Sequence, residues 1–113
     1  MIFCIPVTSD GQTGGGWGRA QRVAFASVSD GQITDWQELE VGWGSSHDEG
    51  TEGSHHARIA RTLIDHKVEA VVTGHMGPGM VRMLGTMKIH VVQGASGDAR
   101  AAVGAAAAQL SQL

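Results

Sequence analysis

The chain has 113 residues, 42% of them hydrophobic, and a net charge of −3, which indicates one globular domain over residues 1–113 and excludes a disordered chain. The negative charge argues against nucleic acid and acidic membranes as partners, and the apolar runs are far shorter than a membrane span. The N-terminal stretch "MIFCIPV" lacks the basic segment and long apolar core of a signal peptide, and the single cysteine, Cys4, rules out an internal disulfide, so we expect a cytoplasmic protein.

The first part of the chain is predicted to form three antiparallel strands. The nearly continuous apolar run over 2–7 is typical of a strand that is covered on both faces. Residues 22–28 have the composition of a second strand, and Asp30-Gly31 is a hairpin signal before a returning strand over 33–41. These segments together predict an antiparallel meander.

A long polar loop and an amphipathic helix follow. The stretch "GWGSSHDEGTEG" over 42–53 is rich in glycine, and loops of this length in small domains are usually functional or mobile. Ser54 is predicted to cap a helix over 55–66. The apolar side of this helix is predicted to contain Ile59, Ala60, Leu63 and Ile64.

Two further strand-and-helix units complete the chain. Short strands are predicted over 70–73 and 88–93. Pro78 suits the first turn of the helix between them, because an N–H group has no intrahelical partner there. A last alanine-rich helix is predicted to end near Leu110. The element order βββαβαβα therefore predicts an α/β fold whose later strands are parallel, with right-handed crossovers.

The strand ends indicate where a ligand would bind. If the first strand joins the sheet in parallel with the later ones, the segments 8–11, 73–79 and 93–97 leave the sheet at the same edge. Ligands of open α/β sheets bind outside the carboxyl ends of the strands. We therefore expect a functional site where these three segments meet.

The most distinctive of the three is "TGHMGPG" over 73–79. Its glycines are Gly74, Gly77 and Gly79. The free N–H groups of a helix that begins at Pro78 favour an anion, either a phosphate or a metal–sulfur cluster. His75 offers an imidazole to a metal and Met76 a soft thioether. The alternative is a tight turn with an exposed histidine, and the spacing matches neither the Walker loop nor the dinucleotide fingerprint.

Histidines in and beside the long loop are further candidate metal ligands. They are His47, His55 and His56. Neighbouring helical residues point about 100° apart, so His55 and His56 cannot easily bind one metal; we expect His56 to be partly buried and His55 to face the loop. The alternative is a polar loop with incidental histidines, because no HExxH or Cys/His zinc pattern is present. His66 and His90 are predicted to be structural.

The segment "TGGGWGRA" over 13–20 supplies two more candidates. Trp17 in a flexible loop can cover a ligand, and Arg19 can pair with an anion. The alternative is that Trp17 folds onto the edge of the sheet. Cys4 is predicted to be buried packing, because a reactive thiolate needs an accessible, electropositive setting. No Ser/His/Asp set or carboxylate pair has a spacing that indicates catalysis.

Four stretches, "MIFCIPV", "GWGRA", "VEAVVTGHMGPGMVRML" and "KIHVVQGASGDARAAV", together resemble the dinitrogenase iron-molybdenum cofactor biosynthesis family, which includes NifX, NafY and the C-terminal part of NifB. The resemblance covers nearly the whole chain in the same order. It implies a three-layer α/β/α ribonuclease H-like fold with a mixed five-stranded sheet. It also implies binding or carriage of an anionic metal–sulfur cluster, such as the iron-molybdenum cofactor, without catalysis. The implied partners are proteins that donate or accept the cluster.

The resemblance also bears on individual residues. "GWGRA" is similar to a His-Phe-Gly-Arg-Ala motif of the family, so that Gly16 stands where the family has histidine and Trp17 where it has phenylalanine. If that histidine is a cluster ligand, this chain lacks it, and His75 with His55 or His56 is the candidate replacement. The cofactor-binding set is then Trp17, Arg19, Gly74, His75, Met76, Gly77 and Gly79, with metal ligands among His47, His55, His56 and His75.

Two other functions are compatible with the sequence. A regulatory domain would bind a small anion or metabolite in the same strand-end pocket. A nuclease with ribonuclease H chemistry would need several acidic metal ligands at strand positions, and only Asp10 and Asp35 lie near the early strands.

Overall fold

The computed structural model describes residues 1–46 and 52–112. Over these residues the backbone forms a mixed five-stranded sheet in the order β3-β2-β1-β4-β5. The strands are β1 (Ile2–Pro6), β2 (Arg22–Ser29), β3 (Gln32–Glu40), β4 (Ala70–Val72) and β5 (His90–Val92). β1 pairs antiparallel with β2 and parallel with β4, and β4 pairs parallel with β5. The predicted α/β fold with a mixed sheet is confirmed.

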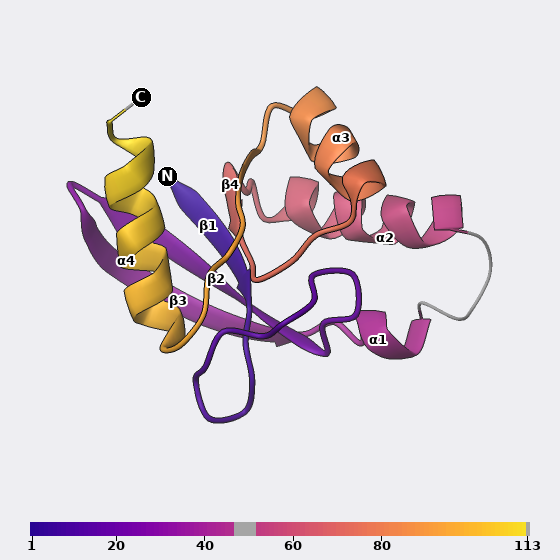
Figure 1. Cartoon of the computed structure of the whole chain (residues 1–113), viewed down its shortest axis with the longest axis horizontal. Coiled ribbons are helices and arrows are strands. Elements are labelled where there is room, and N and C mark those ends of the chain that lie inside the picture. The colour runs from indigo at the N-terminus through magenta and orange to yellow at the C-terminus, as the bar shows by residue number, and fades with distance from the viewer. Residues whose placement is uncertain (47–51, 113) are drawn as a thin grey trace.

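Helices cover both faces of this sheet. They are α1 (Trp43–Ser46), α2 (Glu52–Asp65), α3 (Pro78–Thr86) and α4 (Ala99–Leu110). Figure 1 shows α4 on one side of the strands and α2 and α3 on the other. Alternate residues of β1 serve the two faces: Phe3 belongs to the core cluster that contains Val103 of α4, and Cys4 to the cluster that contains Leu84 of α3. This layering is compatible with the ribonuclease H-like fold that the resemblance implies.

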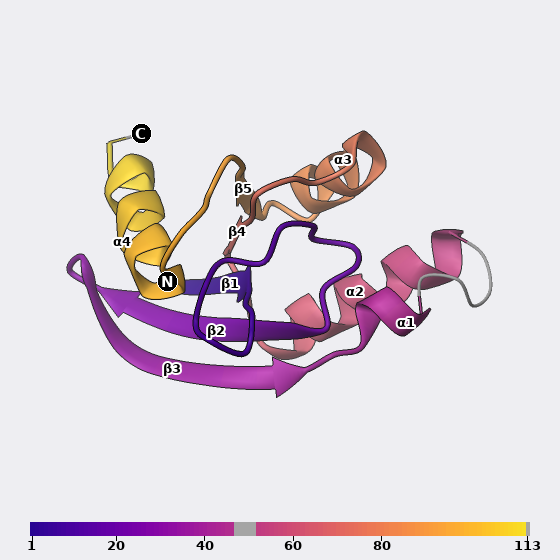
Figure 2. The same cartoon turned by 60° about the horizontal axis from the view of Figure 1, so that its bottom comes forward.

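β2 and β3 form a hairpin around the predicted turn, and Figure 2 shows these two long strands side by side. Asp30 and Gly31 adopt φ angles of 51° and 78°. Two consecutive left-handed residues form the turn whose twist matches that of the flanking strands, which is why Asp-Gly is a strong hairpin signal.

Several local predictions about α2 were wrong. The helix begins at Glu52, so that Ser54 lies within the first turn instead of capping it. Ile64 is 60% exposed, because the covered side of the helix follows the i, i+4 line of His55, Ile59 and Leu63. The short helix α1 also forms within the segment predicted to be entirely loop.

The start of β5 also differs from the prediction, which placed it at Lys88. Lys88 adopts a φ of 62°, and Ile89 N donates to Leu84 O at 2.9 Å, so these residues close the helix and β5 begins only at His90. His90 was predicted to be packed, but its side chain is exposed, because β5 is an edge strand. His66 does have the predicted structural role, since its ring stacks on Phe25 with 4.1 Å between centroids.

Cys4 is fully buried in β1, as predicted. Burial raises the pKa of its thiol well above the ordinary range, because the charged thiolate is poorly solvated in the core. The thiol therefore stays protonated at neutral pH and contributes packing. Across the described part of the chain, no helix combines the length and the apolar character that crossing a membrane requires.

Candidate functional site

The segments that follow β1, β4 and β5 meet at one edge of the sheet, as predicted. Gly94 N donates to Gly74 O at 3.0 Å, which joins the segments after β5 and β4. Thr13 N donates to Gly97 O at 2.7 Å, which joins the segment after β1 to the one before α4. The expected common edge therefore exists and is held by backbone hydrogen bonds.

His75 lies beside Gly16 at this edge. His75 N donates to Gly15 O and Trp17 N donates to His75 O, each at 3.1 Å, so that His75 and Gly16 form a parallel bridge. Directly paired residues project their side chains from the same face of such a ribbon. Since His75 is exposed, its imidazole projects from the face on which a side chain at position 16 would stand.

Gly74 is required by the close approach of the loops. A Cβ atom at this position would lie 2.9 Å from Gly15 O and 3.3 Å from Ala95 O. The next residues are also held: Thr73 is fully buried, and Met76 N donates to the side-chain Oε1 of Gln93 at 2.9 Å. The absence of a side chain at Gly74 therefore lets the loops pack closely, and the backbone around His75 is fixed before any ligand binds.

Two of the predicted cofactor-binding residues lie in the core. Trp17 is 1% exposed and meets Trp43 in an edge-to-face contact with 5.0 Å between ring centroids. Met76 is 4% exposed and belongs to the same cluster. For Trp17 this placement agrees with the alternative interpretation in that the ring packs against the protein and is not held in a flexible loop. A tryptophan between glycines has no periodic pattern that would reveal such burial.

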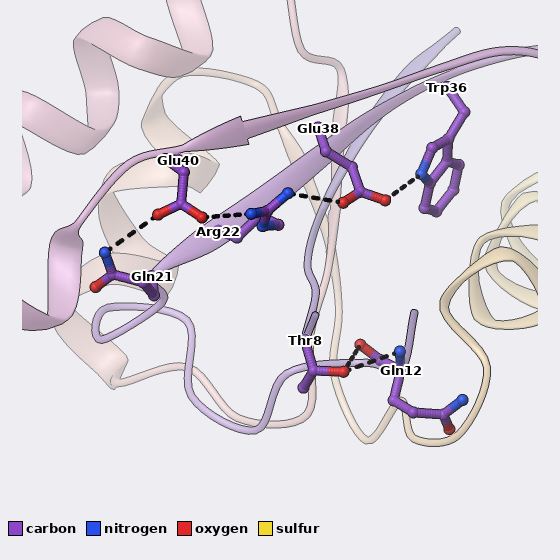
Figure 3. A network of polar contacts seen from close by, with 7 residues as sticks. All are labelled: Thr8, Gln12, Gln21, Arg22, Trp36, Glu38 and Glu40. Atoms are coloured by element: carbon purple, nitrogen blue, oxygen red, sulfur yellow. Dashed lines mark hydrogen bonds and ion pairs between the residues drawn. The ribbon is translucent and has the colours of Figure 1, made fainter. Parts of the chain in front are cut away.

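A pocket of about 340 Å³ lies next to Gly14–Gly16, and both Arg19 and Arg22 line it. Arg22 is neutralised by Glu40 at 2.6 Å and Glu38 at 3.3 Å, in the polar network of Figure 3. Arg19 is exposed and makes no ion pair with any residue that the structure describes. Arg19 is therefore the cation that an anionic ligand would find in this pocket.

A second, smaller pocket of about 250 Å³ lies at the N-terminus of α3. It is lined by Trp17, Gly18, His55, His56, Gly77, Pro78, Gly79 and Met80. His55 is buried, with Nε2 2.8 Å from Gly18 O, so it contacts the segment after β1. His56 is half-buried, as expected. Five of the predicted site residues thus share this pocket, whereas Arg19 lines the other and His75 lines neither.

The predicted metal ligands that the structure describes, His55, His56 and His75, are not gathered into one set. Among the residues that the structure describes, no group of three His, Cys, Asp or Glu side chains is placed to hold a metal ion. His55 and His56 are neighbours, with 6.3 Å between ring centroids, and His47 lies outside the described residues. The described part of the site can supply single histidine ligands and positive charge. A preformed zinc site would instead need three or four protein ligands around one point.

Comparisons with known proteins agree with this architecture. The family model described as "Dinitrogenase iron-molybdenum cofactor" matches residues 1–109. No curated protein matches the chain. The solved structure of PH0822 has a TM-score of 0.76 at 19% identity and covers 96% of this chain and 90% of its own. The structure of a candidate NifB protein of the DUF35 family from Thermotoga has a TM-score of 0.68 at 17% identity. The match covers 95% of this chain and 87% of that protein. The structure of a candidate dinitrogenase from Methanocaldococcus jannaschii has a TM-score of 0.61 at 11% identity. The match covers 87% of this chain and 79% of that protein. At these identities the likeness shows a shared fold.

Proposed function

This chain belongs to the dinitrogenase iron-molybdenum cofactor family, and on that premise we propose that it binds and carries an anionic metal–sulfur cluster as cargo. Membership of the family implies involvement in the biosynthesis or binding of the iron-molybdenum cofactor. The proposal adds a non-catalytic carrier role and assigns the ligand contacts to residues of this chain.

The observation that carries the proposal is the bridge between His75 and Gly16. In the resemblance of "GWGRA" to the family's His-Phe-Gly-Arg-Ala motif, Gly16 stands where the motif has histidine. The paired His75 is exposed and projects from the same face of the ribbon. A neutral imidazole is a good ligand for iron and neighbouring transition metals. In this proposal His75 supplies, from the neighbouring backbone segment, the imidazole that this chain lacks at position 16.

Charge supports the same location. Arg19 has no ion pair within the described chain and lies in the pocket beside Gly15 and Gly16. A metal–sulfur cluster brings its own sulfide ligands, so one imidazole and nearby positive charge can hold it without a three-donor protein site. This requirement is compatible with the ligand groups found among the described residues.

The test is anaerobic reconstitution with iron, molybdate and sulfide, followed by gel filtration. The wild-type protein should retain metal and show a charge-transfer absorption band, and His75→Ala should reduce retention at least about tenfold, as loss of groups around a metal commonly does. His90→Ala is the matched control, because His90 is also exposed but lies in the edge strand β5. A colourless wild-type protein, or equal retention in His75→Ala, would contradict the proposal.

A further inference from the structure

We propose that the chain has a second anion site, at the N-terminus of α3, that takes a compact tetrahedral oxyanion of the phosphate or molybdate type. This site is the pocket between Gly77–Met80 and the segment that carries Trp17. His75 and Arg19 do not line it. The proposal therefore goes beyond the cluster-binding function and does not depend on it.

The start of α3 offers backbone donors without a competing cap. Gly77 is the N-cap residue and makes no side-chain cap hydrogen bond, and Pro78 at the first helical position has no N–H group. The N–H groups of Gly79 and Met80 lie in the first turn, where no intrahelical partner exists. No acidic side chain occupies this turn. The helix dipole and these N–H groups together favour a bound anion.

The pocket has the size and lining for a small anion. Its volume of about 250 Å³ lies below the range of roughly 300–1,000 Å³ that is common for organic ligands. Among the residues that the structure describes, no Asp or Glu side chain lines it. A Cβ atom at Gly77 would meet no atom within 4 Å, so there is open space in front of the helix. A Cβ atom at Gly79 would lie 3.6 Å from Cε1 of His56, which places this imidazole beside the same turn.

The indole of Trp17 gives an independent indication of a ligand. Trp17 lines the pocket and is 1% exposed, and its Nε1 is buried without a hydrogen-bond partner in the described structure. A buried donor left unpaired is destabilising, and such groups are rare in native proteins. An oxyanion oxygen in the pocket would accept this hydrogen bond as well as those from the helix.

The test uses metal-free protein in chelator and measures binding of phosphate, sulfate, molybdate and acetate by calorimetry and thermal shift. Saturable binding of the tetrahedral anions, with weaker binding of acetate, is expected. Tighter binding of molybdate or of phosphate would identify which source of the oxyanion the site prefers, and either supports the proposal. Absence of saturable binding by every tetrahedral anion would overturn it.

Gly77→Asp and Gly77→Asn form the matched pair of variants. Both side chains have the same size and both are good helix N-caps, so the two proteins should fold at least as stably as the wild type. Only aspartate adds negative charge in front of the helix. We expect at least about tenfold weaker oxyanion binding in Gly77→Asp than in Gly77→Asn, which corresponds to a difference of about 1.4 kcal/mol. Oxyanion affinities in both variants equal to that of the wild-type protein would contradict the site.

The cluster proposal and the oxyanion proposal can fail separately. His75→Ala should bind oxyanions like the wild-type protein even though it loses the cluster. Trp17→Phe removes the indole N–H and should weaken oxyanion binding if the variant remains folded. A loss of oxyanion binding in His75→Ala would show that both ligands share one site, and would contradict the separation proposed here.

Discussion

Replacing Trp17 by alanine is expected to lower the free energy of unfolding by about 3–5 kcal/mol, the usual cost of removing a large aromatic side chain from a core. Trp17 is 1% exposed, and its ring meets Trp43 edge to face. Domains of this size are stable by only about 5–15 kcal/mol, so the variant should lose a large part of its stability. Urea denaturation followed by circular dichroism measures the change.

Trp36→Ala is the control for this substitution. Trp36 is half-buried on β3, where its Nε1 donates to Glu38 and the guanidinium of Arg100 lies 4.5 Å from its ring centroid. Such a partly exposed contact contributes about 0.5–1 kcal/mol, so the variant should be clearly milder. A Trp17→Ala protein as stable as Trp36→Ala would show that Trp17 is a mobile loop residue able to cover a ligand.

Gly74→Ala should destabilise the protein by about 1–3 kcal/mol, the typical cost of forcing an extra group into a packed region. The added Cβ atom would approach Gly15 O to 2.9 Å and Ala95 O to 3.3 Å. Both contacts are with backbone, which cannot rotate away as a flexible side chain would. The three segments at the sheet edge would have to separate. Thermal and urea unfolding measure the loss of stability.

The matched control is Gly16→Ala. A Cβ atom at Gly16 would meet nothing within 4 Å, and neither Gly16 nor Gly74 has a positive φ, so the comparison isolates the effect of space. Gly16→Ala should stay within about 0.5 kcal/mol of the wild type, as is usual for surface substitutions. Similar losses in the two variants would mean that Gly74 is not tightly enclosed.

The order of elements could be predicted because local patterns determine it. The apolar run in β1, the Asp30-Gly31 turn and Pro78 at the start of α3 each report a conformation that neighbouring residues enforce. The shared edge of the sheet followed from the parallel order of the strands. Topology alone therefore located the region of the candidate site.

The arrangement within that region could not be predicted in the same way. The bridge between Gly16 and His75 joins segments far apart in the chain, and no local pattern encodes it. The burial of His55 depends on which side of α2 faces the core. His55 lies four residues before Ile59, on the same side of the helix as Ile59 and Leu63, and is therefore buried with them. Gln93, whose side chain fixes Met76 N, was missed because an exposed glutamine at a strand end gives no distinctive signal.

The central proposal is that His75 takes the place of the histidine that the similar family motif has at position 16, and the most direct test is cluster retention in the double variant His75→Ala/Gly16→His. A side chain at Gly16 has room, since its Cβ atom would meet nothing within 4 Å, and it would project from the same face of the ribbon as His75. Moving the imidazole across the bridge is predicted to restore the metal and the charge-transfer band that His75→Ala loses. A folded double variant that remains as free of metal as His75→Ala would contradict this account.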